Sequence, residues 1–166
     1  DLLTNVDTGS ASVLLSLDIS AAFDTLDHSF LLQRAENLFG FTGSVHAWLA
    51  SYLAGRSSYV SINNFRSDTV IHTSGVPQGS VLGPLLFSMF TTPVGRLISS
   101  FGLSYHQYAD DTQLYTALNV SAANGASILS VCTDAVTRWH LENGLLLNPS
   151  KSEAIVTGTR HQVKSV

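Results

Sequence analysis

The chain has 166 residues, of which 12% are charged and 45% are hydrophobic, and its formal net charge is −4. This length suffices for one domain with a core, but typical globular domains carry about 25% charged residues. We therefore interpret the chain as a piece of a larger protein whose apolar faces meet neighbouring domains. Its eight lysines and arginines are too few for a self-sufficient nucleic-acid-binding module, which normally presents a basic face.

The sequence also fits poorly with a membrane protein or a disulfide-rich protein. The longest run without an acidic or basic side chain, residues 69–95, is interrupted by glycines and prolines. A membrane-spanning helix needs about 20 mainly apolar residues. The N-terminal residues show no signal-peptide pattern. The single cysteine, Cys132, excludes an internal disulfide and a cysteine-based zinc site.

The first third of the chain predicts a strand followed by two helices. Residues 1–12 are polar and predict a lead-in without structure of its own. Residues 13–19 form a nearly continuous apolar run, typical of a central strand covered on both faces. Asp18 stands at the far end of this run, where an unpaired buried charge would be costly. It is therefore either hydrogen-bonded there or part of a site that favours negative charge.

The two expected helices span about 30–38 and 44–53. Asp27 or Ser29 is a suitable N-cap for the first helix. The expected apolar face of the second helix consists of Val45, Trp48, Leu49 and Tyr52.

The middle of the chain predicts a hairpin, an unusual loop and a helix. Residues 59–62 and 69–72 are the expected hairpin strands, joined through Asn63 and Asn64. Residues 74–84 carry glycines at four-residue spacing, which fits a binding loop at least as well as a plain long loop. The helix that follows runs to about Ile98, with Pro84 in its first turn and with Pro93 expected to kink or divide it.

A second hairpin and a long helix complete the predicted elements. Residues 103–108 and 112–118 are the expected strands, and Asp110 and Asp111 lie at the turn. Two aspartates in a turn are ordinarily solvated turn residues. Residues 122–142 predict an amphipathic helix before a last strand at 153–157, and the whole pattern indicates an α+β fold. The expected apolar stripe of the helix consists of Ile128, Val131, Cys132, Ala135 and Trp139.

Three carboxylates would meet at one edge of the sheet if the second hairpin pairs beside the first strand. Asp18 ends that strand, and Asp110 and Asp111 lie at the hairpin turn. Like charges repel one another unless divalent cations sit among them, and Mg²⁺ prefers such oxygen ligands. Two such ions can hold the attacking and leaving oxygens of an in-line displacement at phosphorus. The spacing alone makes this arrangement possible without establishing it.

Four segments together resemble successive motifs of reverse transcriptases, most of all those of LINE-type (non-long-terminal-repeat) retrotransposons. The likeness covers roughly residues 13–158, in the order of that family, and no single motif is specific by itself. The segments are Leu17–Asp24, Ser74–Ser80, Tyr108–Asp111 and Leu147–Lys151.

The resemblance implies a fold and a metal site. The fold is the polymerase palm, a ferredoxin-like or RRM-like antiparallel sheet with helices on one face, together with part of the fingers. Asp18, Asp110 and Asp111 match the metal-binding aspartates, and the backbone carbonyl of Ile19 is also expected at a metal. The expected cofactor is a pair of Mg²⁺ ions, with Mn²⁺ as a possible substitute.

Further roles follow from the same resemblance. Phe23 matches the bulky gate against the ribose 2′-hydroxyl, although a core aromatic explains it equally well. Lys151 matches a lysine proposed to protonate the pyrophosphate leaving group, although a solvated turn lysine is the simpler explanation. Asp24 and Asp27 are interpreted as cap or turn residues, and the six histidines show no ligand spacing. The remaining residues expected to contact nucleotide or template are Ser74, Gly75, Pro77, Gln78, Gly79, Tyr108 and Ala109.

The implied activity is RNA-directed DNA polymerisation during retrotransposition. The partners would be an RNA template with a DNA primer, dNTPs, and further fingers, thumb and endonuclease domains of the same polyprotein. We expect residues 1–166 to be one partial reverse transcriptase domain, without upstream fingers or downstream thumb, and with little or no polymerase activity in isolation. No membrane association is expected. The resemblance implies an intracellular location, in the nucleus.

Two other functions remain open. The chain could be a decayed or domesticated palm that only binds nucleic acid or a protein partner. It could also be another palm-fold nucleotidyltransferase or cyclase, which would explain the carboxylates but not the loop from Gly75 to Gly79.

Overall fold

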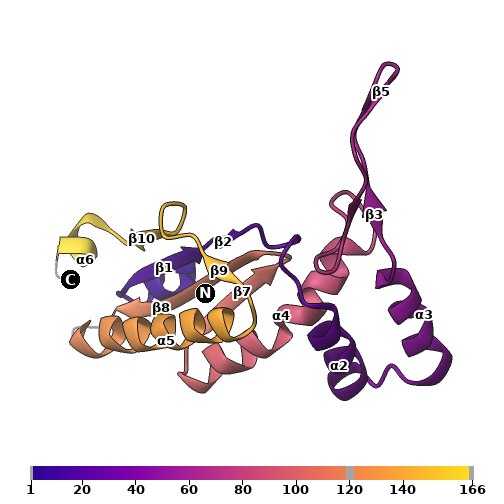
Figure 1. Cartoon of the computed structure of the whole chain (residues 1–166). Coiled ribbons are helices and arrows are strands. Elements are labelled where there is room, and N and C mark those ends of the chain that lie inside the picture. Colours follow the sequence, from indigo (N-terminus) through magenta and orange to yellow (C-terminus); the bar gives the residue numbers. More distant parts are fainter. Residues whose placement is uncertain (1, 119–121, 165–166) are drawn as a thin grey trace. The chain divides into compact units, whose positions relative to one another are not determined.

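The structure, a computed structural model, describes residues 2–118 and 122–164 (Figure 1). The chain separates into two compact units, one formed by Asp1–Ser20 with Thr91–Val166 and the other by Ala21–Phe90. Both combine helices with antiparallel strand pairs, so the predicted α+β fold is confirmed. Whether the two units together constitute one partial reverse transcriptase domain stays a prediction. Among the described residues, no helix combines the length and the apolar character that crossing a membrane requires.

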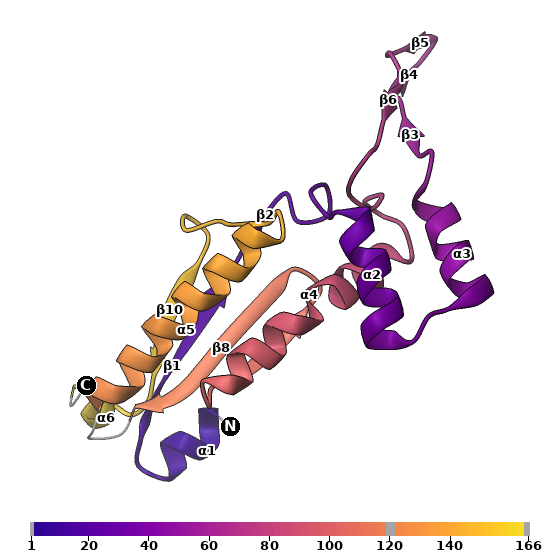
Figure 2. The same cartoon turned by 60° about the horizontal axis from the view of Figure 1, so that its bottom comes forward.

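A four-stranded antiparallel sheet organises the first unit. Strand β1 (Ala11–Leu17) lies between β8 (Asp111–Leu118) and β10 (Glu153–Thr157), and β7 (Ser104–Tyr108) forms an edge beside β8 (Figure 2). This confirms three predictions, namely the central strand, the hairpin that carries the two aspartates and the last strand. The hairpin pairs directly beside the first strand, as the carboxylate hypothesis requires.

Helices α5 (Ala122–Glu142) and the second half of α4 (Gly83–Ser100) cover one face of this sheet (Figures 1 and 2). Complete burial of an aliphatic side chain contributes roughly 1.5–3 kcal/mol, so this layer accounts for much of the unit's stability. The buried side chains between the helices and the sheet are Leu17, Val94, Ile98, Leu103, Leu114, Cys132 and Val136.

The buried face of α5 differs from the predicted stripe. Cys132, Val136 and His140 are buried, whereas Ile128 and Val131 are exposed. The buried positions follow the helical spacing i, i+4, i+8 and include a histidine, which a search for apolar residues alone passes over. The expected helix is therefore present with the predicted bounds, but it is rotated about its axis relative to the prediction.

The expectation of an unstructured lead-in was wrong. Helix α1 (Leu2–Asp7) precedes β1, and the amide of Asn5 donates a 2.9 Å hydrogen bond to the hydroxyl of buried Ser12. A helix of only six residues gains its stability from such tertiary contacts rather than from its own propensity. Residue 1 lies outside the described residues.

Two short elements extend the first unit. Strand β2 (Ile19–Ser20) continues beyond β1 and pairs with β9 (Leu146–Leu147). Helix α6 (Arg160–Lys164) follows β10.

The second unit contains helix α2 (His28–Phe39), helix α3 (Gly43–Leu53) and a long hairpin. The carboxylate of Asp27 accepts hydrogen bonds from the backbone N–H groups of Ser29 and Phe30, so the predicted N-cap is confirmed. The predicted apolar face of α3 was wrong in part, because Trp48 is 58% exposed and Leu53 is buried in its place.

The long hairpin is built from two strand pairs. Strand β3 (Ser57–Ser58) pairs with β6 (Val70–Ile71), and β4 (Ser61–Ile62) pairs with β5 (Phe65–Arg66). The predicted turn at Asn63 and Asn64 is confirmed, but the returning strand begins directly after it rather than near residue 69.

Helix α4 passes through Pro93 as a single helix. A proline inside a helix removes one backbone hydrogen bond and costs about 3 kcal/mol. Burial of Met89 and Phe90 before the proline and of Val94 after it offsets that cost. The expected division of the helix at Pro93 therefore does not occur, while Pro84 lies in the first turn as predicted.

Candidate active site

The pairing of β1 with β8 places the first carboxylate beside the hairpin turn. The last residue pair of this ladder is Leu17 with Thr112. Asp18 follows Leu17 directly and Asp111 precedes Thr112 directly, so the two aspartates stand at the neighbouring ends of adjacent antiparallel strands. They are brought together by register, over a distance of more than ninety residues in sequence.

The turn between β7 and β8 has only two central residues, Ala109 and Asp110. It is closed by the pairing of Tyr108 with Asp111. Ala109 has a φ of +52°, and Asp110 does not have a positive φ. An alanine at this position is strained, because a Cβ disfavours positive φ.

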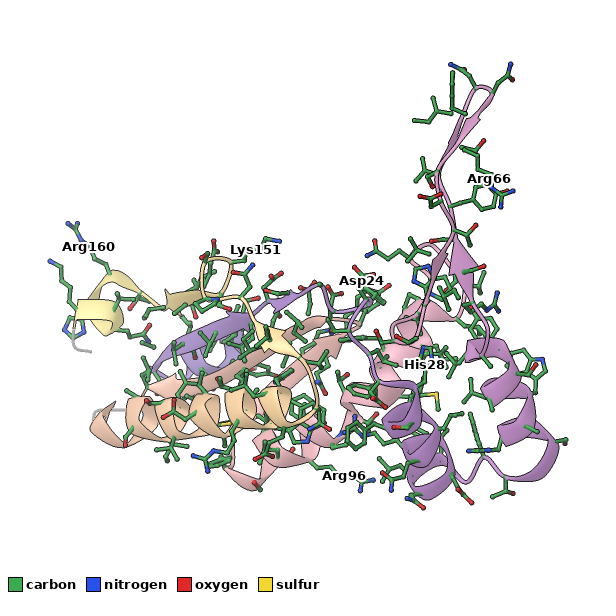
Figure 3. All side chains as sticks on the ribbon, in the orientation of Figure 1. Asp24, His28, Arg66, Arg96, Lys151 and Arg160 are labelled. Atoms are coloured by element: carbon green, nitrogen blue, oxygen red, sulfur yellow. The ribbon has the colours of Figure 1, made fainter. Side chains whose placement is uncertain are left out.

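Asp18 is held in place by the loop between β9 and β10. Its backbone carbonyl accepts a 2.8 Å hydrogen bond from the N–H of Asn148, and its own N–H donates to the hydroxyl of Ser152 at 3.3 Å. One carboxylate oxygen, Oδ2, is buried and has no hydrogen-bond partner. The same loop carries Lys151 (Figure 3), whose Nζ lies 3.9 Å from that Oδ2. Lys151 is 69% exposed, so it is a turn lysine that nevertheless places its charge beside Asp18.

The carboxylate side chains at this site are of the type that binds hard cations, but they do not form a complete set of metal ligands in this structure. In the part of the chain that the structure describes, no three His, Cys, Asp or Glu side chains are close enough together to hold a metal ion. The buried Oδ2 of Asp18, which lacks a donor, is nevertheless an atom that a cation would satisfy. Carboxylate oxygens are the ligands that Mg²⁺ prefers. The metal roles of Asp18, Asp110 and Asp111, and of the carbonyl of Ile19 in β2, stay predictions.

Phe23 is a packed aromatic residue, and its role as a gate stays a prediction. Its ring is half-buried and packs against the fully buried ring of Phe87 in α4, with centroids 5.1 Å apart and a tilt of 44°. An aromatic contact of this kind holds the ring in one orientation. Part of its surface is left open, as a gate would require.

The loop of residues 74–79 is fastened to the turn that contains Phe23. The N–H of Gly75 donates to the carbonyl of Leu26 and the N–H of Val76 to that of Phe23, both at 2.7 Å. Gly75 has a φ of +79°, and a Cβ built there would lie 2.7 Å from the carbonyl oxygen of Phe23. Real Cβ contacts are never this short, so only glycine fits.

Two polar side chains strengthen the same junction. The ring Nε2 of His28 lies 2.7 Å from the carbonyl oxygen of Gly75. Because a carbonyl only accepts, Nε2 carries the proton. Ser74 donates its hydroxyl to the carbonyl oxygen of Asp24 at 3.1 Å. His28 and Asp24 (both labelled in Figure 3) were not identified as site residues from sequence. The only indication in the sequence was that both residues follow Phe23 closely. This becomes informative only because the structure shows the Phe23 turn in contact with the loop of residues 74–79.

Gln78 lines a pocket of about 700 Å³ within the second unit. Its amide Nε2 donates to both carboxylate oxygens of Asp24, at 3.1 and 3.3 Å. Pro77 also lines the pocket, and its carbonyl accepts from Ser80 at 3.1 Å. Gly79 has a φ of +78° and open space around it.

The predicted site residues thus fall into two groups. Asp18, Ile19, Lys151 and the Tyr108–Asp111 turn belong to the first unit, while Phe23 and the 74–79 loop belong to the second. Each group is assembled by contacts within its own unit.

Comparison with known proteins identifies the family. A profile described as reverse transcriptase (RNA-dependent DNA polymerase) matches residues 3–165. The chain belongs to the reverse transcriptase family. Enzymes of this family generally depend on divalent metal ions, which is consistent with the oxygen-rich chemistry at Asp18.

Relatives come from mobile elements, which confirms the resemblance to LINE-type reverse transcriptases. The chain is 33% identical over 150 residues to the RNA-directed DNA polymerase from mobile element jockey of Drosophila melanogaster, covering 87% of this chain and 16% of the relative. It is 33% identical over 149 residues to a probable RNA-directed DNA polymerase from transposon BS of the same species, and the match covers 82% of this chain and 15% of that relative. A retrovirus-related Pol polyprotein from the type-1 retrotransposable element R2 of Popillia japonica is 26% identical over 161 residues, and the match covers 91% of this chain and 25% of that relative.

Solved structures of telomerase share the fold. Apo telomerase from Candida tropicalis, truncated from its C-terminal domain, matches with a TM-score of 0.67 at 14% identity, covering 94% of this chain and 32% of that one. The Candida tropicalis enzyme with a fragment of telomeric RNA matches with a TM-score of 0.68 at 12% identity, covering 96% of this chain and 28% of that one. These likenesses confirm the polymerase palm and fingers fold.

Proposed function

We propose that this chain supplies the catalytic palm of an RNA-directed DNA polymerase, which transfers nucleotides from dNTPs to a primer 3′-hydroxyl during retrotransposition. The family match over residues 3–165 supports the reaction class. The observation that carries the proposal is the register of β1 on β8. It puts Asp18 and the turn with Asp110 and Asp111 at the same end of two adjacent strands.

The metal-binding residues in this proposal are Asp18, Asp110 and Asp111, with the backbone carbonyl of Ile19. Their ligands would be two Mg²⁺ ions, for which Mn²⁺ is a possible substitute. When bound, such ions neutralise phosphate charge and hold the attacking and leaving oxygens in line. The chain's own contribution is positioning, because strand ends hold the carboxylates more firmly than a free loop would.

Other residues bind and orient the substrates in this proposal. Phe23, held by Phe87, would exclude a ribose 2′-hydroxyl by occupying its space. The loop with Ser74, Gly75, Pro77, Gln78 and Gly79 would contact the incoming nucleotide and the template, and Tyr108 and Ala109 would border the same substrates. Lys151 keeps an ammonium group beside Asp18 and is exposed, so it could deliver a proton to the departing pyrophosphate.

The proposed partners are an RNA template, a DNA primer and dNTPs. Support comes from the relatives, which are named RNA-directed DNA polymerases, and from a structural neighbour solved with telomeric RNA. This chain spans 16% of the jockey protein and 25% of the R2 polyprotein. We therefore propose that fingers, thumb and endonuclease domains of the same polyprotein complete the enzyme.

Primer extension by the full-length protein tests this function. We expect Asp110→Asn to abolish extension of a DNA primer on an RNA template in the presence of Mg²⁺, with an unchanged thermal unfolding midpoint. Asp134→Asn, which removes an exposed carboxylate from α5, is the matched control and should leave extension unchanged. Near-normal extension by Asp110→Asn would refute the metal assignment. A wild-type protein that binds RNA–DNA hybrid but never extends it would support the alternative of a binding-only palm.

A further inference from the structure

The hydrogen bonds between Gln78 and Asp24 determine which way the Gln78 amide points. An ionised carboxylate accepts hydrogen bonds and donates none. The amide group facing Asp24 is therefore Nε2, whose distances to Oδ1 and Oδ2 are 3.1 and 3.3 Å. The chemistry of Asp24 settles the amide orientation, which otherwise has two nearly equivalent choices. The carbonyl oxygen Oε1 of Gln78 is consequently turned away from Asp24.

The backbone of Asp24 is itself firmly held. Its N–H donates to the carbonyl oxygen of Ala21 at 2.9 Å, and its carbonyl oxygen accepts the hydroxyl of Ser74 at 3.1 Å. The α-carbon of Gly75 packs so closely that an added Cβ would lie 2.8 Å from the same carbonyl oxygen. Asp24 therefore differs from an ordinary surface aspartate, because its backbone is fixed on both sides.

Gln78 and its hydrogen-bond partner Asp24 border a pocket. Asp24 and Gln78 both line the pocket of about 700 Å³, together with Tyr52, Arg56 and His72. Arg56 stacks on Tyr52 and donates its Nε to the Tyr52 carbonyl oxygen at 2.6 Å, so that wall of the pocket is ordered as well. A ligand in this pocket would meet one defined orientation of the Gln78 amide.

We propose that Asp24 is a positioning residue, which holds the amide of Gln78 in a single orientation for binding the incoming nucleotide. This inference rests on the proposed polymerase function and adds a residue to it. Asp24 itself does not touch substrate in this account. Without it, the exposed Gln78 side chain would rotate freely, and its donor and acceptor ends would exchange places. Ordering that side chain would then weaken nucleotide binding.

A double-mutant cycle in the full-length protein tests the proposal. Steady-state primer extension is measured for wild type, Asp24→Ala, Gln78→Ala and the double variant. We expect Asp24→Ala to raise KM for dNTP by about 5- to 10-fold, which lies within the net contribution of a typical intramolecular hydrogen bond, with kcat changed by less than about twofold. We expect the double variant to match Gln78→Ala, because residues that act through one contact are not additive.

Three controls separate positioning from general damage. Asp68→Ala removes another exposed carboxylate from the same unit and should leave KM unchanged. Asp24→Asn keeps an acceptor but allows either amide end to face it, so its KM should lie between those of wild type and Asp24→Ala. The thermal unfolding midpoint is recorded for every variant, and if Asp24→Ala does not fold, Asp24→Asn replaces it in the cycle.

The outcomes that contradict the proposal are distinct from those that contradict the polymerase function. An active wild type with fully additive losses, or with an unchanged KM in Asp24→Ala, would overturn the positioning role alone. A correctly folded wild type that extends no primer would overturn the proposed function, and this inference with it.

Discussion

Two buried polar atoms in the described part of the chain have no hydrogen-bond partner, Oδ2 of Asp18 and Nε2 of His140. Such atoms are expensive to bury, so each needs a reason. Asp18 lies at a strand end beside Lys151, where a cation would satisfy its oxygen. His140 is 1% exposed and belongs to the buried face of α5, together with Cys132 and Val136. The proposed metal site therefore accounts for Oδ2 of Asp18, whereas Nε2 of His140 affects the stability of the fold.

His140 makes stability depend on pH. Its Nδ1 lies 2.8 Å from the Val136 carbonyl oxygen, so Nδ1 carries the proton and Nε2 is a bare acceptor. Burial lowers the pKa of His140, and the hydrogen bond to Val136 opposes this to a smaller extent. The unfolded chain therefore binds a proton at a higher pH than the folded chain does. The contribution of His140 to stability is fully present above a pH of about 6.5 and is lost as the pH falls below it.

We expect His140→Leu to flatten the decline in the free energy of unfolding between pH 7.5 and 5.5. In the wild type, one such group can lower that free energy by up to about 1.4 kcal/mol for each pH unit. Urea unfolding at a series of pH values measures the slope. His106→Leu, a change at an exposed histidine in β7, is the control and should keep the wild-type slope. Equal slopes for the wild type and His140→Leu would contradict the prediction.

At the scale of the elements, the loop of residues 74–79 contains a close backbone approach at Gly75. Gly75 and Gly79 have almost the same φ, +79° and +78°, but only Gly75 lies against other backbone atoms. The two glycines therefore separate the cost of backbone strain from the cost of a steric clash. This comparison is available because nothing lies within 4 Å of a Cβ at Gly79.

We expect Gly79→Ala to lower the free energy of unfolding by about 1 kcal/mol, the strain of a left-handed alanine. Gly75→Ala should cost clearly more, about 2–4 kcal/mol, because the loop must also separate from the Phe23 turn. Urea unfolding of both variants measures the difference. In the full-length enzyme, Gly75→Ala should also reduce primer extension more than Gly79→Ala does. Equal destabilisation would show that the contact is unimportant.

At the scale of the whole molecule, several of the strongly exposed apolar side chains among the described residues lie on the long hairpin of the second unit. Ile62 is 66% exposed, Phe65 82% and Ile71 71%. Exposed apolar surface of this kind promotes association. The low proportion of charged residues, 12%, leaves few charges to oppose it.

We expect the isolated 166-residue chain to self-associate at micromolar concentration and Phe65→Lys to reduce that association. The unfolding midpoint should change little, because Phe65 buries little surface within the chain. Sedimentation velocity measures the association, and Thr69→Lys, which adds the same charge at an exposed polar residue, is the control. An unchanged sedimentation profile for Phe65→Lys would contradict the assigned role of the hairpin surface.

Local pattern was enough to determine the main elements and the family. The apolar run of residues 13–19, the alternation around Asp110 and the periodicity of α5 each depend on residues that are close together in sequence. Four short motifs in the correct order identified a reverse transcriptase, which the family match confirms.

Tertiary structure alone decided how these elements meet. The Leu17–Thr112 register, the buried face of α5 and the positive φ of Ala109 depend on packing and pairing that no local window contains. The bond between Asp24 and Gln78 joins residues 54 positions apart, and neither residue signals the other in sequence. A strand's register and a side chain's partner are set by non-local contacts, so they become visible only when the chain is folded.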